Sequence, residues 1–263
     1  MVRDRKHIQE SRKELLSGIG IPEPAPFRAD RFQLQAVESL LRGDDTLVIA
    51  PTGTGKTYIA VEAIRHIAAQ GKRAIYTAPL KALSNTKYTE FKKLFEPQFR
   101  VGLLTGDRKI ETDADVVVAT TEIYRNDLYS YCDSYSLVVL DELHYLADIQ
   151  RGPVWEESII LSPKSVTLLM LSASISNPHE IADWISTIRG KSVSVILEDR
   201  RPVPLRLGFL HPELGLLPLE EEKGKVFPEV HQFYSEGGLE RNGFSRRGGG
   251  SRRRGRSRQR WRR

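Results

Sequence analysis

The segment APTGTGKT, residues 50–57, combines two glycines with a lysine and a threonine in the spacing of a phosphate-binding loop. It follows the apolar run TLVIA and precedes a stretch with helical spacing, the context that such a loop needs. The glycines let backbone N–H groups turn toward phosphate oxygens, and the N-terminus of the next helix adds positive potential. Lys56 offers a mobile charge for phosphates, and the Thr57 hydroxyl is placed for Mg²⁺. The predicted nucleotide-binding residues are Thr52, Gly53, Thr54, Gly55, Lys56 and Thr57.

Two adjacent carboxylates, Asp141 and Glu142, follow the apolar run LVVL. Ligands of open parallel sheets bind at the carboxyl ends of the strands, where the strand before the phosphate loop also ends. We therefore expect Asp141 to hold Mg²⁺ through its water shell and Glu142 to orient or deprotonate the attacking water. DELH alone would also suit a helix start, with acids near its positive end. Beside the phosphate loop, the catalytic interpretation is favoured: Glu142, Asp141 and Lys56 as catalytic residues, Thr57 and Asp141 as metal ligands.

Short β-branched runs alternate with helical stretches between Phe27 and about Arg200. Several runs are apolar at consecutive positions, which is typical of strands buried on both faces of a parallel sheet. Segments 58–70 and 81–95 have helical spacing and can form right-handed crossovers. The predicted fold is α/β, a three-layer sandwich of helices around a mostly parallel sheet. The predicted strands are residues 46–50, 74–78, 101–104, 116–120, 137–140, 166–171 and 193–197.

The composition fits one large globular domain with extensions, since 40% of the 263 residues are hydrophobic and 28% are charged. No apolar run approaches the roughly 18 residues of a membrane span, so we expect no membrane association and a cytoplasmic location. The single cysteine, Cys132, rules out an internal disulfide or a zinc cluster of cysteines. The net charge is +6, and residues 241–263 carry eleven arginines without any lysine or acid, which leaves −5 on the other 240 residues.

APTGTGKT together with DELH resembles motifs I and II of the superfamily-two DExH-box helicases. The stretch from DELHYLADIQRGPVWEES to SASISNPHEIADWI is similar to the superkiller-like RNA helicase branch, and RGPVWEE, SNP and RRPVPL are its more discriminating elements. The resemblance covers about residues 27–205 and implies the first RecA-like domain of a P-loop NTPase, with ATP and Mg²⁺ as cofactors. A P-loop kinase or a transporter ATPase would not explain these elements in this order.

Further residues are assigned by this resemblance alone. Gln33 takes the place of the family's adenine-reading glutamine, and Phe27 would stack on the adenine ring; a buried role for Gln33 within its helix is the alternative. TAPLKALSN, TGD and ATTEIYRN resemble motifs Ia, Ib and Ic, where polar groups and helix N-termini hold phosphates without reading bases. Ordinary turn and loop positions are the alternative there. The predicted nucleic-acid contacts are Pro79, Lys81, Ala82, Thr105, Gly106, Asp107, Thr121 and Glu122.

His144 and the motif III segment Ser172, Ala173 and Ser174 are expected to couple the nucleotide site to neighbouring elements. Motif III normally ends in threonine; serine keeps the hydroxyl and loses a methyl group, so we expect weakened coupling. The family also uses a second RecA-like domain with motifs IV to VI and an arginine finger. We recognise none of these after Leu205, and therefore expect very slow turnover by this chain alone.

These patterns predict four segments along the chain. They are an N-terminal extension (1–26), the helicase ATP-binding domain (27–200), a linker or the start of a missing second domain (201–240), and an Arg/Gly-rich disordered tail (241–263). The tail would either bind RNA phosphates, with Trp261 stacking on a base, or be a solubilising or non-native end.

The leading function is an ATP-dependent helicase domain that hydrolyses ATP to drive strand separation. RNA, single-stranded or with a single-stranded overhang, is the expected substrate, with DNA less favoured. The partners would be a second motor domain or an RNA-degradation complex. The alternative is a non-catalytic module that binds ATP and RNA, or half of a split motor.

Overall fold

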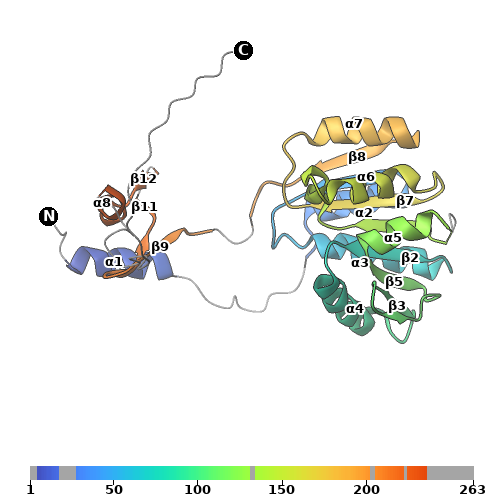
Figure 1. Ribbon diagram of the computed structural model, residues 1–263, viewed down its shortest axis with the longest axis horizontal. Helices are drawn as coiled ribbons and strands as arrows, with labels where there is room; N and C mark the ends of the chain where they lie inside the picture. Colours follow the sequence, from blue (N-terminus) through green and yellow to red (C-terminus); the bar gives the residue numbers. More distant parts are fainter. Residues whose placement is uncertain (1–4, 18–27, 131–133, 202–204, 222–223, 236–263) are drawn as a thin grey trace, which may run out of the picture. The chain divides into compact units, whose positions relative to one another are not determined.

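The computed structural model describes residues 5–17, 28–130, 134–201, 205–221 and 224–235 (Figure 1). The chain divides into two compact units, Ala25–Pro204 and a second unit made of Met1–Pro24 and Leu205–Arg263. Phe27, Cys132 and the arginine-rich tail lie outside the described residues. The predictions made for them therefore stay predictions.

An eight-stranded sheet forms the centre of the larger unit, with the strand order β4-β3-β5-β2-β6-β7-β1-β8. Neighbouring strands pair in parallel throughout, except that β4 at one edge runs antiparallel to β3. The strands are β1 (Asp45–Ile49), β2 (Ala74–Ala78), β3 (Val101–Leu104), β4 (Lys109–Ile110), β5 (Val116–Thr120), β6 (Leu137–Leu140), β7 (Thr167–Ser172) and β8 (Val193–Leu197).

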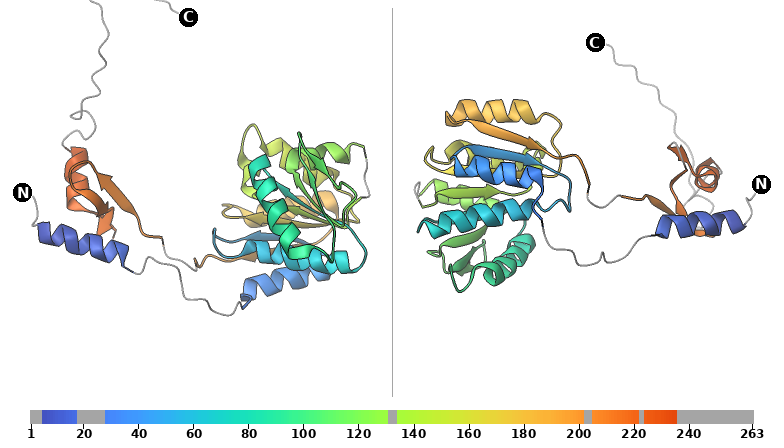
Figure 2. Two further views of the ribbon diagram at one scale, coloured as in Figure 1. Left: turned by 90° about the horizontal axis from the view of Figure 1, so that it is seen from below. Right: turned by 180° about the vertical axis from the view of Figure 1, so that it is seen from behind.

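Helices cover both faces of this sheet (Figure 2). Successive strand residues point to opposite faces, so Leu47 and Val48 of β1 enter different apolar cores. One core also contains residues of α2 (Arg31–Leu41), α3 (Lys56–Ala69) and α4 (Lys81–Phe95). The other contains residues of α5 (Thr121–Leu128), α6 (Gly152–Leu161) and α7 (Pro178–Arg189). The predicted three-layer α/β sandwich is confirmed.

The strand boundaries agree closely with the apolar runs of the sequence. Five of the seven predicted strands have the same bounds in the structure, while β1 and β7 are each displaced by one residue. The two-residue edge strand β4 was not predicted, because a pair of residues is too short to show an alternating pattern. A 3₁₀ helix, η1 (Leu143–Ala147), follows the DELH segment.

The smaller unit has helices and strands within residues 205–235, a stretch that the sequence predicted to be a linker or the start of a missing second domain. It contains α1 (Arg5–Leu16), the hairpins β9 (Gly208–His211) with β10 (Gly215–Pro218) and β11 (Glu220–Glu221) with β12 (Lys225–Val226), and α8 (Pro228–Ser235). Ile8 of α1 is buried together with Leu217, Phe227 and Val230. Arg12 also donates from Nε to the Leu216 carbonyl at 2.8 Å. The N-terminal segment and residues 205–235 therefore share one small core, which local patterns could not reveal because its halves lie about 200 residues apart.

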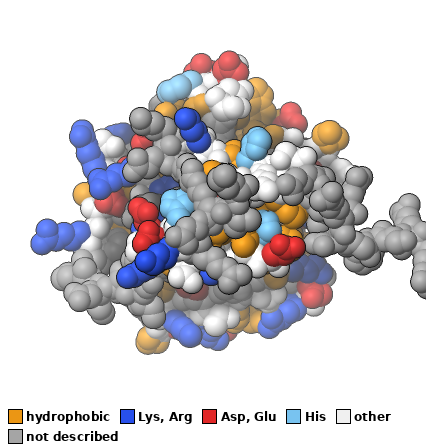
Figure 3. Space-filling model, turned by 90° about the vertical axis from the view of Figure 1, so that its left-hand side faces the viewer, with side chains coloured by type: hydrophobic (Ala, Val, Ile, Leu, Met, Phe, Trp, Pro, Cys, Tyr) orange, Lys and Arg blue, Asp and Glu red, His pale blue; other side chains and the backbone are white. Residues whose placement is uncertain are grey.

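Basic and acidic side chains lie interspersed on the face of the molecule drawn in Figure 3. Of the helices in the described part of the chain, none is long and apolar enough to cross a membrane.

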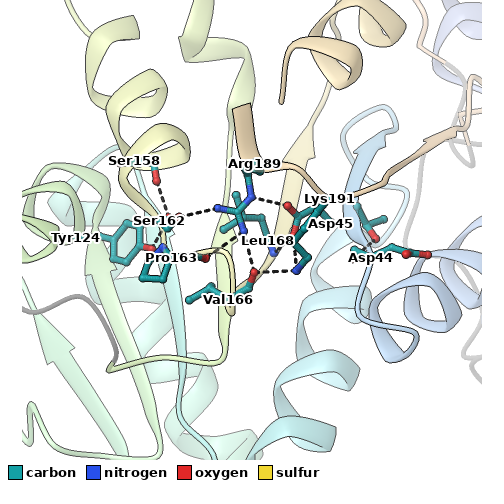
Figure 4. Close-up of polar contacts among 11 residues, drawn as sticks. Asp44, Asp45, Tyr124, Ser158, Ser162, Pro163, Val166, Leu168, Arg189 and Lys191 are labelled. Atoms are coloured by element: carbon teal, nitrogen blue, oxygen red, sulfur yellow. Dashed lines mark hydrogen bonds and ion pairs between the residues drawn. The ribbon is translucent and has the colours of Figure 1, made fainter. Parts of the chain in front are cut away.

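A buried ion pair joins β1 to α7 at the amino-terminal edge of the sheet (Figure 4). Arg189 donates from Nε to Asp45 Oδ2, and the two side chains are only 1% and 0% exposed. The Asp45 carboxylate also accepts the Leu168 backbone N–H at 2.9 Å. Arg189 donates further to the carbonyls of Ser162 and Val166, at 2.9 and 2.8 Å. Each buried charge thus has several partners, which is the condition for burying an ion pair without a large cost.

We expect Arg189→Met to lower the free energy of unfolding by about 3–5 kcal/mol, because it leaves the Asp45 carboxylate buried without its main partner. Urea denaturation of the wild type and the variant measures this loss. The matched control is Arg42→Met, which removes an exposed arginine paired with Glu38 at 3.3 Å and should cost less than about 1 kcal/mol. Equal losses in the two variants would contradict the role given to the buried pair.

Candidate nucleotide and nucleic-acid site

The predicted site residues gather at one edge of the sheet. Because the six strands that precede them all run in the same direction, the segments that follow these strands leave at the same, carboxyl-terminal edge. These segments are the phosphate loop after β1, residues 79–82 after β2, 105–107 after β3, 121–122 after β5, 141–144 after β6 and 172–174 at the end of β7.

The phosphate loop has the backbone that its glycines predict. Gly53 and Gly55 have φ values of +88° and +81°, in the region where residues with a Cβ are strained, and α3 begins directly after them at Lys56. The Lys56 ammonium donates to the carbonyls of Ala50 and Pro51, at 2.5 and 3.2 Å. The side chain of Lys56, the first residue of α3, therefore folds back onto the beginning of the phosphate loop.

Gln33 reaches the phosphate loop from α2. Its side chain is 2% exposed and donates from Nε2 to the carbonyls of Thr54 and Gly55, at 3.1 and 3.0 Å. Its Oε1 accepts the Asp30 backbone N–H at 2.9 Å. The side-chain amide thus connects the start of α2 to the loop, a clamping role that sequence reasoning did not identify. Recognition of adenine by Gln33 stays a prediction.

Asp141 is held from several sides at the end of β6. Its Oδ1 accepts the Glu142 backbone N–H at 2.9 Å, and its Oδ2 accepts the hydroxyl of Tyr76. The indole of Trp155 donates to the Asp141 carbonyl at 3.4 Å. Tyr76 and Trp155 are fully buried. Sequence reasoning missed both: Tyr76 lies in a strand and looks like an ordinary core residue, while Trp155 was noted only as part of RGPVWEE.

Glu142 has a backbone conformation that is unusual for its residue type. Its φ of +55° lies in the left-handed region, at a cost of about 1–2 kcal/mol, and such strained residues are frequent at active sites. Its Oε2 lies 3.3 Å from His144 Nδ1. Partial burial and the nearby Asp141 carboxylate raise the Glu142 pKa, against the opposing effects of His144 and Lys56. A glutamate with a raised pKa is better suited to accept a proton from water.

Burial also lowers the pKa of Lys56, while the negative charges of Glu142 and Asp141 act to raise it. The three residues predicted to be catalytic therefore interact electrostatically in the folded chain. In such an arrangement the Lys56 cation suits the binding of a phosphate, and the two carboxylates suit the binding of a metal ion.

A second lysine contacts the phosphate-loop threonine. Lys87 of α4 donates to Thr57 Oγ1 at 3.1 Å and forms an ion pair with Glu90 at 2.9 Å. A cationic group thus already lies against the hydroxyl that was predicted to bind Mg²⁺. The hydroxyl of Thr57 and the carboxylate of Asp141 are hard oxygen donors, which Mg²⁺ prefers. The residues at this edge of the sheet therefore fit a magnesium-bound nucleotide.

The segments that resemble motifs Ia and Ib lie together. Lys81 forms an ion pair with Asp107 at 3.2 Å, and Asp107 also accepts the Thr105 hydroxyl at 3.0 Å. The Thr105 hydroxyl and Lys81 lower the pKa of Asp107. Lys81, Ala82, Gly106 and Asp107 are exposed and form a polar surface at this edge.

Other predicted nucleic-acid residues are less accessible. The side chains of Pro79, Thr105 and Thr121 are buried, and the Thr121 hydroxyl donates to Thr77 Oγ1 at 3.5 Å. Glu122 is half-buried. Their burial leaves these three residues little surface for direct contact with a nucleic acid.

Three of the four predicted coupling residues, His144, Ala173 and Ser174, line a groove beside the phosphate loop. Its volume is about 1010 Å³, and its wall includes Pro51, His144, Ala173, Ser174 and Arg201. Buried Ser172 donates through its hydroxyl to the Ser174 carbonyl at 3.2 Å. The His144 ring stacks on Tyr145, with centroids 4.9 Å apart, and Tyr145 stacks on Trp155 at 5.3 Å. A chain of rings thus joins the groove to the tryptophan that contacts Asp141.

The clamp between Gln33 and the phosphate loop can be tested with two neighbouring glycines. Both have positive φ, but a Cβ on Gly55 would meet Gln33 Nε2 at 2.7 Å, whereas a Cβ on Gly53 would meet nothing within 4 Å. We expect Gly55→Ala to lower the free energy of unfolding by about 1–2 kcal/mol more than Gly53→Ala, because it displaces two hydrogen bonds as well. Urea denaturation without nucleotide measures both losses. In a Gln33→Ala background the difference should disappear; a difference that persists would count against the clamp.

Several named proteins are similar to this chain. It is 49% identical over 207 residues to DExH-box ATP-dependent RNA helicase DExH15, chloroplastic, of Arabidopsis thaliana, an alignment that covers 75% of this chain and 17% of that protein. It is 42% identical over 212 residues to antiviral helicase SKI2 of Saccharomyces cerevisiae, covering 78% and 16%. With superkiller complex protein 2 of Homo sapiens the identity is 44% over 191 residues, covering 70% and 15%. The chain therefore spans about a sixth of the length of these relatives.

A solved structure, the DUF1998 helicase MrfA bound to DNA, has a similar fold, with a TM-score of 0.55 and 20% identity over 75% of this chain and 30% of that one. At this identity the likeness concerns the fold alone. Residues 30–181, more than half of the chain, match the family described as DEAD/DEAH box helicase. With its phosphate loop, its DELH segment and its RecA-like sheet, the chain belongs to the DEAD/DEAH box helicase family.

Proposed function

We propose that this chain binds ATP with Mg²⁺ and hydrolyses it as the first motor domain of an RNA helicase. The observation that carries the proposal is the electrostatic interaction of Lys56 with Asp141 and Glu142 at one edge of the sheet, where Thr57 follows Lys56 in the chain. Membership in the helicase family supports it. Because the chain spans about a sixth of its relatives, the activity of the whole protein is part of the proposal.

Each residue has a role that its position supports. The N-terminus of α3 and the Lys56 ammonium bind the phosphates, once Lys56 gives up the carbonyls of Ala50 and Pro51. Thr57 and Asp141 hold Mg²⁺, which when bound neutralises charge on the β- and γ-phosphates. Glu142 orients the attacking water and accepts its proton, and its raised pKa suits that role.

RNA is the proposed substrate because a relative that is 49% identical to this chain is named as an ATP-dependent RNA helicase. The exposed surface of Lys81, Ala82, Gly106 and Asp107 would contact the nucleic-acid backbone. Such contacts do not by themselves distinguish RNA from DNA. A second motor domain, which would cover the groove lined by His144 and Arg201, and an RNA-degradation complex are the proposed partners. A cytoplasmic location stays a prediction, since one relative is named as chloroplastic.

Steady-state ATP hydrolysis by this polypeptide, with and without single-stranded RNA, tests the proposed function. We expect slow turnover that RNA stimulates and that Lys56→Ala abolishes, because the ammonium is needed at the phosphates. The same measurement with single-stranded DNA compares the two substrates. Nucleotide binding without any turnover would favour the alternative, a non-catalytic module or half of a split motor. A wild-type chain that does not bind the nucleotide at all would contradict the proposal.

Lys87 offers a separate test of the metal site. Its ammonium must leave the Thr57 hydroxyl before that oxygen can bind Mg²⁺. We therefore expect Lys87→Met to tighten the binding of Mg²⁺-ADP about two- to tenfold, the equivalent of one hydrogen bond that no longer competes. Titration with a fluorescent ADP analogue measures the affinity. Lys92→Met, on the same helix and paired with Glu96 at 3.7 Å, is the matched control. Weaker binding by Lys87→Met alone would show that Lys87 assists the nucleotide instead.

A further inference from the structure

Tyr76 is a fully buried core residue whose hydroxyl meets the predicted magnesium ligand. Tyr76 lies opposite Val139 in the parallel pairing of β2 with β6. Residues two apart in a strand share a face, so Asp141 continues the same face of the chain beyond Val139. The long side chain of Tyr76 therefore extends along this face to the Asp141 carboxylate, where the hydroxyl donates to Oδ2.

The ring of Tyr76 is held rigidly. It packs edge-on against Phe91 of α4, with centroids 5.1 Å apart at 83°, and Phe91 packs in the same way on Phe95, at 5.4 Å and 81°. All three rings are buried. The hydroxyl of the Tyr76 ring donates to the Asp141 carboxylate. A fixed ring with a fixed donor can set the orientation of a carboxylate.

The apolar core alone does not account for a tyrosine at this position. A phenylalanine would give the same contacts with Phe91 and would avoid burying a hydroxyl. The other carboxylate oxygen, Oδ1, is held by the Glu142 backbone N–H, so Asp141 has one donor on each oxygen. An ionised carboxylate has about four acceptor positions, which leaves room for the water shell of a metal ion.

We propose that Tyr76 is a positioning residue that holds the Asp141 carboxylate in the orientation in which it binds magnesium. The proposal rests on the proposed function, since it concerns the same metal site. Without the hydroxyl, only the Glu142 backbone N–H still holds the carboxylate. The carboxylate then rotates more freely about its side-chain bonds, and part of the metal-binding energy is lost in ordering it again. Loss of such a supporting hydrogen bond weakens metal binding about 10- to 100-fold.

The test compares Tyr76→Phe with Tyr124→Phe in the 263-residue chain. Tyr124 is also buried, and its hydroxyl is hydrogen-bonded to Ser162 at 2.7 Å, so this control removes an equivalent group away from the phosphate loop. Both variants keep their ring, and urea denaturation shows whether they remain folded. The affinity for a fluorescent ADP analogue is then measured in Mg²⁺ and in EDTA. Electron paramagnetic resonance of Mn²⁺ in the presence of ADP reports metal binding directly.

We expect Tyr76→Phe to bind the nucleotide normally in EDTA, to lose most of the gain that Mg²⁺ provides, and to bind Mn²⁺ about 10- to 100-fold more weakly. Tyr124→Phe should behave as the wild type in all three measurements. A Tyr76→Phe variant with wild-type metal affinity would overturn the positioning role and leave the proposed function intact. A wild-type chain whose nucleotide binding does not respond to Mg²⁺ would overturn the proposed function, and this proposal with it.

Discussion

The parallel direction of the central strands is the constraint on which the site depends. Six strands end at the same edge of the sheet, and predicted site residues lie at or directly after the end of each one. The phosphate loop, the carboxylates and the motif Ia and Ib segments all lie between residues 50 and 142 of the chain. The sheet brings them together because its strands are buried on both faces and cannot shift without exposing apolar side chains.

Buried polar groups fix the two ends of this arrangement. At the amino-terminal edge, Asp45 and Arg189 join β1 to α7. At the carboxyl-terminal edge, Asp141 is held by Tyr76, by the Glu142 backbone and, through its own carbonyl, by Trp155. In a low-dielectric interior such groups are costly unless each one has partners. They therefore specify one orientation of each side chain, which is what a metal-binding carboxylate needs.

Three side chains hydrogen-bond to the phosphate loop in this structure. Lys56 binds loop carbonyls, Gln33 clamps two more, and Lys87 contacts the Thr57 hydroxyl. Two of them reach the loop from other helices, α2 and α4, and α4 also begins at Lys81 in the predicted nucleic-acid surface. The same helix thus touches both surfaces that a nucleic-acid-dependent ATPase must connect.

The sequence by itself determined the α/β sandwich, most strand bounds and the nucleotide motifs, because these depend on local apolar runs and on residues adjacent in the chain. Tertiary structure decided the rest. Tyr76 lies in a predicted strand and Lys87 in a predicted helix, and neither pattern indicates a contact with the site. The contact between Gln33 and the phosphate loop depends on how α2 packs beside that loop. The second small unit was hidden for the same reason, since Ile8 and Leu217 become neighbours only on folding. Contacts between distant segments depend on how elements pack, and no local pattern records that.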